Sequence, residues 1–106
     1  YLVNAQVIDK EIDNLDKTYF VMYDAYVYKL LLNKKINSYD LLLNGNMGYK
    51  GEDKVINYFD SLDSNTYFLL NLEYEGGQLS KKIDSYIRDN YVKVSTFDDF
   101  ILYKRG

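Results

Sequence analysis

The feature that most constrains this sequence is a regular alternation of helix-type and strand-type hydrophobic patterns. In four segments apolar side chains recur at the spacing of one helix face, which predicts amphipathic helices. Between them lie short continuous runs of β-branched, aromatic and aliphatic residues, which predict buried strands. The predicted helices span residues 4–15, 25–35, 52–62 and 78–90, and the predicted buried strands span residues 18–23, 39–44 and 66–72.

The apolar positions define the predicted core face of each helix. In the first two helices these positions are Ala5, Ile8, Ile12 and Leu15, then Val27, Leu30 and Leu31. In the last two they are Val55, Ile56, Phe59 and Leu62, then Leu79, Ile83, Tyr86 and Ile87. Asp24 stands directly before the second helix, where a carboxylate can accept a hydrogen bond from a free backbone N–H, so it is predicted to be the N-cap.

The last segment departs from the alternation of helix and strand. Residues 92–96 place Val or Thr at every second position, Asp98-Asp99 follows, and residues 100–103 are apolar. This pattern predicts two strands joined by a tight turn. The whole order predicts an α/β fold, and we expect a small three-layer, Rossmann-like sandwich with a mainly parallel sheet and a C-terminal antiparallel hairpin.

Length and composition predict one globular domain. The chain has 106 residues, of which 47% are hydrophobic and 27% charged, so we expect residues 1–106 to form a single α/β domain. It begins at Tyr1 rather than at Met, which we interpret as a sign that the domain is excised from a longer protein. Its apolar runs are all much shorter than the ~20 residues that a membrane-spanning helix needs.

The residue types that are missing exclude several kinds of chemistry. Without Cys there is no disulfide, thiolate nucleophile or zinc finger, and without His there is no Ser-His-Asp triad or histidine base. A pI near 4.8 argues against general nucleic-acid binding, which requires a basic surface. The sequence therefore predicts no catalytic residue, no metal and no cofactor for this segment, and no nucleic-acid partner.

If the domain binds a small ligand, the expected place is the carboxyl edge of the sheet. Ligands of open parallel sheets bind outside the carboxyl ends of the strands. The ligands considered are a nucleotide, a sugar phosphate and a divalent metal. The candidate binding residues are Asp24, Asn44, Asn46, Gly48, Tyr49, Lys50, Glu73 and Tyr74.

The glycine loop at this edge has two interpretations. Gly45, Gly48 and Gly51 lie between a predicted strand and a predicted helix, which is the position of a phosphate-binding turn. Their spacing fits neither the dinucleotide fingerprint nor the P-loop. Glu52 and Asp53 also place negative charge at the start of the helix, where a phosphate would bind. A flexible loop that leads into a helix is therefore favoured over a phosphate cradle.

Acidic and aromatic residues add two further alternatives. Asp24, Glu73 and Glu75 could hold Mg²⁺ or Ca²⁺ through oxygen ligands, but an N-cap and a solvated loop explain them without a metal and are favoured. The 13 tyrosines are spread over all predicted elements, which indicates amphipathic residues at the core boundary rather than a stacking platform. Tyr26, Tyr49 and Tyr74 lie near strand ends and could contact a partner or a sugar.

Three short segments and the order of elements resemble a known family. The segments are Tyr39–Leu43, Thr66–Leu70 and Asp99–Arg105. They resemble the soluble C-terminal domain that follows the membrane spans of bacterial polytopic glycosyltransferases, of the polyprenyl-phosphate-sugar-dependent, mannosyltransferase-like kind. The resemblance implies an accessory domain on the extracytoplasmic face of the cell membrane, with the catalytic residues elsewhere. It also implies two partners, the membrane-embedded remainder of the parent chain and a glycan or lipid-linked sugar.

Three functional hypotheses follow. The favoured one is a non-catalytic accessory or binding domain of a larger cell-envelope membrane protein, for which the resemblance implies a glycosyltransferase. The first alternative is a small α/β domain that binds a ligand at the carboxyl edge, and a cytoplasmic location is the alternative to the extracytoplasmic face. The second alternative is a protein-interaction module that pairs through an edge strand of the terminal hairpin.

Overall fold

The computed structural model describes residues 1–35, 39–40 and 51–106. Within these ranges a four-stranded sheet has the order β1-β2-β4-β3. The strands are β1 (Thr18–Val21), β2 (Tyr67–Asn71), β3 (Val92–Phe97) and β4 (Phe100–Lys104). The helices are α1 (Leu2–Glu11), α2 (Ala25–Leu31), α3 (Gly51–Ser61) and α4 (Lys81–Asn90), with a short 3-10 helix at Leu15–Lys17.

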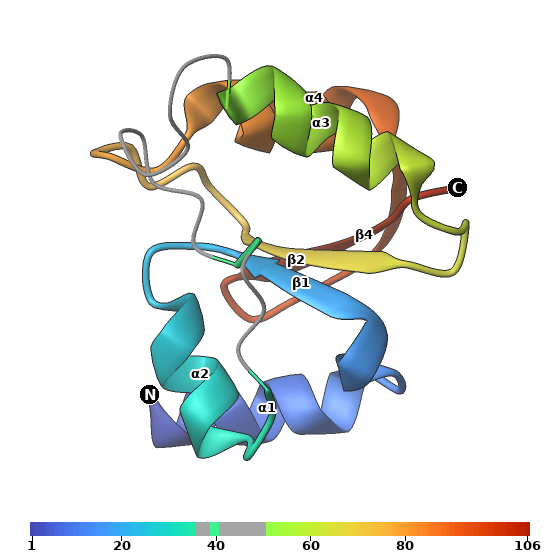
Figure 1. The fold of residues 1–106 in the computed structure, drawn as a ribbon. Coiled ribbons are helices and arrows are strands. Elements are labelled where there is room, and N and C mark those ends of the chain that lie inside the picture. The colour runs from blue at the N-terminus through green and yellow to red at the C-terminus, as the bar shows by residue number, and fades with distance from the viewer. Residues whose placement is uncertain (36–38, 41–50) are drawn as a thin grey trace.

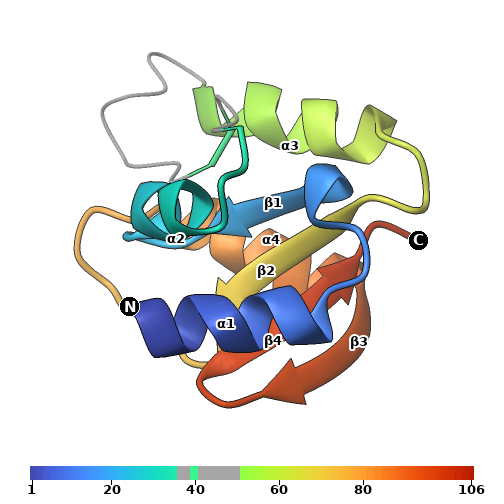
Figure 2. The ribbon, with the colours of Figure 1, turned by 90° about the horizontal axis from the view of Figure 1, so that it is seen from below.

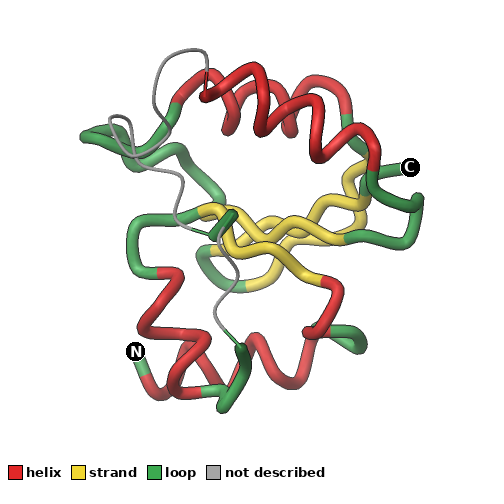
Figure 3. Tube along the Cα trace, viewed as in Figure 1, coloured by secondary structure: helices red, strands yellow, loops and turns green. Residues whose placement is uncertain are grey.

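The helices cover both faces of the sheet in pairs. Helices α1 and α2 lie on one side, and α3 and α4 lie on the other (Figure 1). The tube view shows the strands enclosed between the two pairs (Figure 3). One core cluster joins the sheet to α3 and α4 around Phe59 and Phe68, and the other joins it to α1 and α2 around Ile8 and Phe20. Neighbouring strand residues thus point to opposite faces, as the pleat of a strand requires.

The sheet is mixed, so the expectation of a mainly parallel sheet is wrong. Strand β1 pairs with β2 in parallel, whereas β2 with β4 and β3 with β4 are antiparallel. Seen from the α1 side, β4 lies between β2 and β3 (Figure 2). The physical reason is composition. Strand β4 is apolar and almost entirely buried, while β3 has charged or polar residues between its apolar ones and is largely exposed. The more apolar strand of the hairpin therefore takes the central position beside β2.

Most predicted elements are confirmed, with boundaries that differ by one to a few residues. The predicted core faces of α1, α3 and α4 are confirmed, because their apolar residues are buried or packed against a core cluster. The hairpin is confirmed, and its turn residue Asp98 has a φ of 48°. Tyr39 and Asp40, which begin the predicted strand 39–44, lie in a turn. The remaining residues of that predicted strand, with Gly45 and Gly48 of the glycine loop, fall outside the described residues.

The predicted core face of α2 is wrong. The structure exposes Val27, Leu30 and Leu31, and it buries Lys29 together with Ala25 and Tyr28. The side of this short helix that faces the core is not the one with most apolar residues, because the Lys29 ammonium pairs with Asp40 inside the protein. The spacing of apolar residues within a helix cannot predict a partner that lies 11 residues further along the chain.

None of the helices in the described part of the chain is long and apolar enough to cross a membrane.

Candidate functional site

The carboxyl ends of β1 and β2 meet at one edge of the sheet, as their parallel order predicts (Figure 1). Asp24 follows β1, and Glu75 lies in the loop that follows β2. The two carboxylates interact, since burial and the Asp24 charge together raise the pKa of Glu75. The Asp24 charge also raises the pKa of the Tyr1 phenol. This edge of the sheet therefore carries an acidic pair next to Tyr1.

Asp24 occupies the predicted N-cap position of α2, but its side chain makes no capping hydrogen bond. Its backbone has φ −104° and ψ 27°, which lies outside the extended region typical of a capping residue. Its Oδ1 atom is buried and has no hydrogen-bond partner among the described residues. Buried polar atoms normally have a partner. Among the described residues of the predicted site, Asp24 is therefore the one with an unused hydrogen-bond acceptor that a ligand could occupy.

Of the two glutamates considered with Asp24 as metal ligands, the structure brings Glu75 next to Asp24. Both side chains are exposed, but Glu75 accepts a hydrogen bond from the Asn71 side-chain amide. The loop continues through Gly76 and Gly77, both at positive φ, so its path is irregular. No regular side-chain period applies in such a loop, and sequence spacing could not decide which glutamate turns toward the edge.

The predicted candidate Tyr74 has a structural contact. Its hydroxyl donates a hydrogen bond to the carbonyl oxygen of Leu79, and the Lys81 ammonium lies 5.2 Å from the centre of its ring. The ring therefore closes the loop between β2 and α4. Five other candidates lie outside the described residues, namely Asn44, Asn46, Gly48, Tyr49 and Lys50. Within the described residues no three carboxylates are grouped in a way that could hold a metal ion.

The starts of α3 and α4 are neutralised by side chains of the protein itself. The Ser80 hydroxyl donates to a Glu52 carboxylate oxygen at 2.6 Å, and it accepts a hydrogen bond from the Ile83 backbone N–H. The Lys82 ammonium lies 2.6 Å from an Asp53 carboxylate oxygen. Carboxylates thus already occupy the positive ends of these helices. The preference for a plain helix start over a phosphate cradle stays a prediction, because Gly45 and Gly48 lie outside the described residues.

A second surface feature is an exposed apolar face on α1 and α2, which sequence reasoning missed. We call it the α1–α2 face. Within the described residues it holds eight of the eleven large apolar side chains that are exposed, and Leu30, at 76%, is the most exposed of all. Its members are Tyr1, Leu2, Val3, Tyr23, Tyr26, Val27, Leu30 and Leu31. Six of them lie on α1 and α2, and Tyr1 and Tyr23 lie just before these helices. A contiguous apolar patch on a soluble protein often marks an interaction site.

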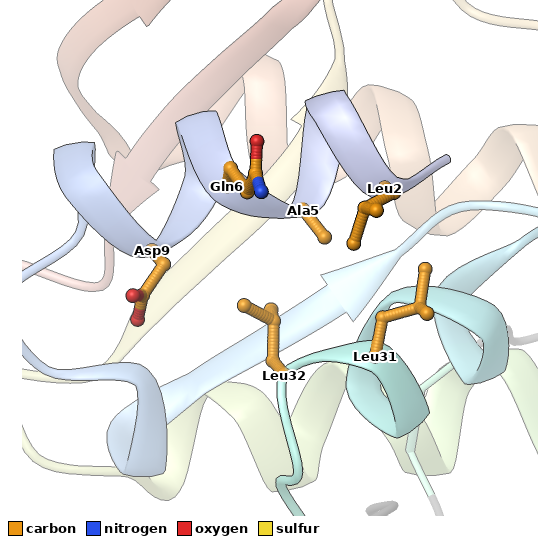
Figure 4. Close-up of a pocket in the computed structure, with 6 residues that line it drawn as sticks. All are labelled: Leu2, Ala5, Gln6, Asp9, Leu31 and Leu32. Carbon is orange, nitrogen blue, oxygen red and sulfur yellow. The ribbon is translucent and has the colours of Figure 1, made fainter.

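A shallow groove of about 180 Å³ runs along the α1–α2 face, between the two helices. Figure 4 shows Leu2 of α1 and Leu31 of α2 pointing toward one another, with Asp9 further along α1. The other lining residues are Ala5, Gln6 and Leu32. The groove therefore has leucine walls and a carboxylate toward one end.

The orientation of α2 is fixed by a buried ion pair. The Lys29 ammonium lies 3.5 Å from an Asp40 carboxylate oxygen, and both side chains are almost completely buried. Lys29 also donates a hydrogen bond to the carbonyl oxygen of Thr18 at 2.9 Å, and Asp40 accepts one from the Phe20 N–H at 2.6 Å. Both backbone groups belong to the side of β1 that faces away from β2. The ion pair therefore provides hydrogen-bond partners for these two backbone groups of β1. It also keeps the leucines of α2 on the side that faces solvent.

The exposed edge strand β3 is a weaker candidate for partner binding. Its register shifts between Lys93 and Ser95, which marks a bulge, and Lys93 places a charge on the strand. Bulges and lysines are devices by which edge strands avoid pairing with other chains. The structure therefore favours the α1–α2 face over the hairpin edge that the sequence suggested.

No protein-family model, curated protein or solved structure shows a significant match to this chain.

Proposed function

We propose that this chain is a non-catalytic binding domain that contacts a protein partner through the α1–α2 face. The observation that carries the proposal is the orientation of α2, which buries Lys29 and exposes Val27, Leu30 and Leu31. A helix on the surface of a monomer normally has its charged side chains outside and its leucines inside. The reverse arrangement is typical of a helix whose outer face is covered in a complex.

The energetics favour such a partner. Covering an exposed leucine side chain is worth about 1.5–3 kcal/mol, so a segment that covers Leu2, Leu30 and Leu31 gains several kcal/mol before the cost of association. Rotating α2 would bury its leucines, but it would break the Lys29–Asp40 pair. It would also remove the hydrogen bonds that this pair makes to the backbone of β1. The fold therefore maintains the apolar face instead of removing it.

The partner in this proposal is the remainder of a larger cell-envelope membrane protein. The resemblance noted in the sequence supports a polytopic glycosyltransferase as the parent, with this domain on the extracytoplasmic face and a glycan or lipid-linked sugar nearby. The Rossmann-like three-layer arrangement belongs to the same proposal, and the helix pairs on both faces of the sheet support it (Figure 1). The cytoplasm is the alternative location.

A photocrosslinking amino acid tests this proposal in the intact gene product. It is placed at Leu30, on the α1–α2 face, or at Asn57, an exposed position on α3 that serves as the control. We expect position 30 to crosslink to a membrane-embedded segment of the same protein and position 57 to give little product. Mass spectrometry of the crosslinked peptides identifies the segment. Equal crosslinking from both positions, or none from position 30, would contradict the proposal.

A second candidate function is ligand binding at the carboxyl edge, and it is favoured by Asp24 Oδ1, which has no hydrogen-bond partner among the described residues. A carboxylate there accepts hydrogen bonds, so a hydroxylated or cationic ligand suits it better than a phosphate. Thermal unfolding in the presence of sugars, nucleotides, sugar phosphates and Mg²⁺ tests this, because a ligand bound only by the folded state raises the Tm. An Asp24→Asn variant is the matched control. A panel without any Tm increase would count against the candidate.

A further inference from the structure

We infer that the segment that binds the α1–α2 face is an amphipathic helix whose apolar side is flanked by basic side chains. The inference rests on the proposed function, and it adds the chemistry of the partner segment. It follows from the shape of the groove, the charges around it, and the elimination of two other occupants.

The shape of the groove suits a helix. Its walls are two helices, and the facing side chains Leu2 and Leu31 stand on opposite sides of it (Figure 4). An amphipathic helix that lies against two helices can place the side chains of one apolar stripe between them. An extended strand would leave its backbone N–H and C=O groups facing leucines, without partners.

Among the described residues, Asp9 is the only charged one that lines the groove, and the exposed Lys10 follows it on α1. Asp9 lines the groove itself, and Asp24 with Glu75 lies beside Tyr1, where the α1–α2 face begins. Among the residues that the structure describes, none of these three carboxylates takes part in an ion pair. The lysine near the end of α2, Lys34, pairs with Asp16 at 3.5 Å. A helix with lysine or arginine on both sides of its apolar stripe complements this pattern.

The same charges disfavour the two other occupants. A membrane surface rich in anionic lipids attracts lysine and arginine, whereas the groove is lined by the Asp9 carboxylate. A second copy of the chain in a two-fold dimer would contribute the same face, whose groove is lined by a carboxylate and, in the described part of the chain, by no basic side chain. A basic helix from a different segment avoids both conflicts.

The test uses a synthetic amphipathic peptide of about 18 residues, long enough to be helical when bound, with leucines on one side, flanking lysines and a single Trp. The chain contains no Trp, so Trp emission reports the peptide alone. A second peptide carries glutamate in place of lysine. At low salt we expect the lysine peptide to bind about tenfold more tightly, and added salt to reduce this ratio.

Variants of the chain separate the charge effect from the apolar contact. Asp9→Asn combined with Glu75→Gln should bring the two peptides to similar affinities. Asp89→Asn combined with Asp98→Asn changes the net charge equally at exposed positions outside the face, and should leave the ratio unchanged. Leu31→Ser should weaken both peptides, whereas Leu72→Ser, at a similarly exposed leucine outside the face, should weaken neither.

Each remaining outcome overturns the inference in a recognisable way. Equal affinities that both fall in Leu31→Ser would refute the basic helix while leaving the binding face intact. If neither peptide binds, the helix is refuted as occupant. The proposed function would then be tested separately by the crosslinking experiment. Binding to anionic vesicles that Leu31→Ser abolishes would assign the face to a membrane. A dimer in light scattering that Leu31→Ser dissociates would assign it to a second copy.

Discussion

At the scale of single residues, the Lys29–Asp40 pair determines more of this molecule than any other polar contact that the structure describes. The Lys29 ammonium also lies 4.7 Å from the centre of the Phe20 ring, so aromatic and backbone groups surround the charge. A buried ion pair adds little stability relative to apolar residues, but removing one partner leaves an uncompensated charge. Its main effect here is on specificity, because it selects which side of α2 faces the core.

The first prediction concerns the loss of one member of this pair. Lys29→Met leaves the Asp40 carboxylate buried without its cation and should lower the free energy of unfolding by about 3–5 kcal/mol, measured by urea denaturation. Adding Asp40→Asn removes the second charge while keeping an amide oxygen for the Phe20 N–H, and should restore part of the loss. The control is Lys17→Met, in an exposed pair with Asp63, which should cost less than about 1 kcal/mol. Equal effects of both lysine variants would contradict the buried pair.

The second prediction concerns stability at high pH. The Tyr91 hydroxyl donates to Asp60 at 2.8 Å, and burial followed by this contact raises the pKa of Tyr91. Below the unfolded-state pKa of about 10 both states keep the proton, so its contribution is fully present. Above about pH 10 the unfolded state loses the proton first, and stability falls as pH rises toward the folded-state pKa. Urea denaturation between about pH 8 and 11 should show a shallower decline in Tyr91→Phe, and identical slopes would refute this.

At the scale of elements, a single arginine joins α4 to the end of β2. The Arg88 guanidinium donates to the carbonyl oxygens of Asn71 and Leu72, at 2.6 and 2.8 Å, and to the buried Asp84 carboxylate at 2.6 Å. These contacts direct the chain out of the sheet at the carboxyl edge. The planar fork of arginine allows all of them at once, which the single ammonium of lysine cannot do.

The third prediction tests this link. Arg88→Lys keeps the charge but loses part of the fork, and should lower the free energy of unfolding by about 1–3 kcal/mol. Amide hydrogen exchange in residues 72–80 should become faster, because the loop is then held less firmly. Lys82→Gln, in the exposed pair with Asp53, is the control and should leave exchange in that loop nearly unchanged. Protection that is the same in Arg88→Lys and the wild type would contradict the assigned role.

The elements also show how far the sequence could predict the structure. The faces of α1 and α4 follow from their spacing, since Ile8, Ile83 and Ile87 are fully buried. The face of α2 could not be predicted, because it depends on the long-range contact between Lys29 and Asp40. At the candidate site, Asp24 could be placed by its position after a strand. Glu73 and Glu75 could both be named from their position after the next strand, but the sequence could not decide which of them approaches Asp24, because the loop is irregular.

At the scale of the whole molecule, apolar surface is concentrated on one side. The α1–α2 face carries most of the exposed leucines and valines of the described residues, while the helices on the other side, α3 and α4, expose mainly charged and polar side chains. The position of β4 between β2 and β3 could not be read from chain order, since either strand of a hairpin can take the inner place.

The fourth prediction compares an apolar residue of the face with one of the core. Leu30→Ser removes a side chain that is 76% exposed, so the free energy of unfolding should change by no more than about 0.5 kcal/mol. Its retention on a hydrophobic interaction column should fall, because less apolar surface is presented. Leu69→Ala, at a fully buried leucine, should cost about 2–5 kcal/mol. A loss in Leu30→Ser as large as that in Leu69→Ala would show that α2 has the opposite orientation in solution.

The central place of β4 has a consequence for biosynthesis. Chains are made from the N-terminus at about 5–20 residues per second, and β4 follows every other described element in sequence. Until Phe100–Lys104 leaves the ribosome, β2 has a bare edge on one side and β3 has no neighbour. The two core clusters also both lack their β4 side chains until then. Apolar surface of both core clusters therefore stays uncovered during synthesis until this strand is made.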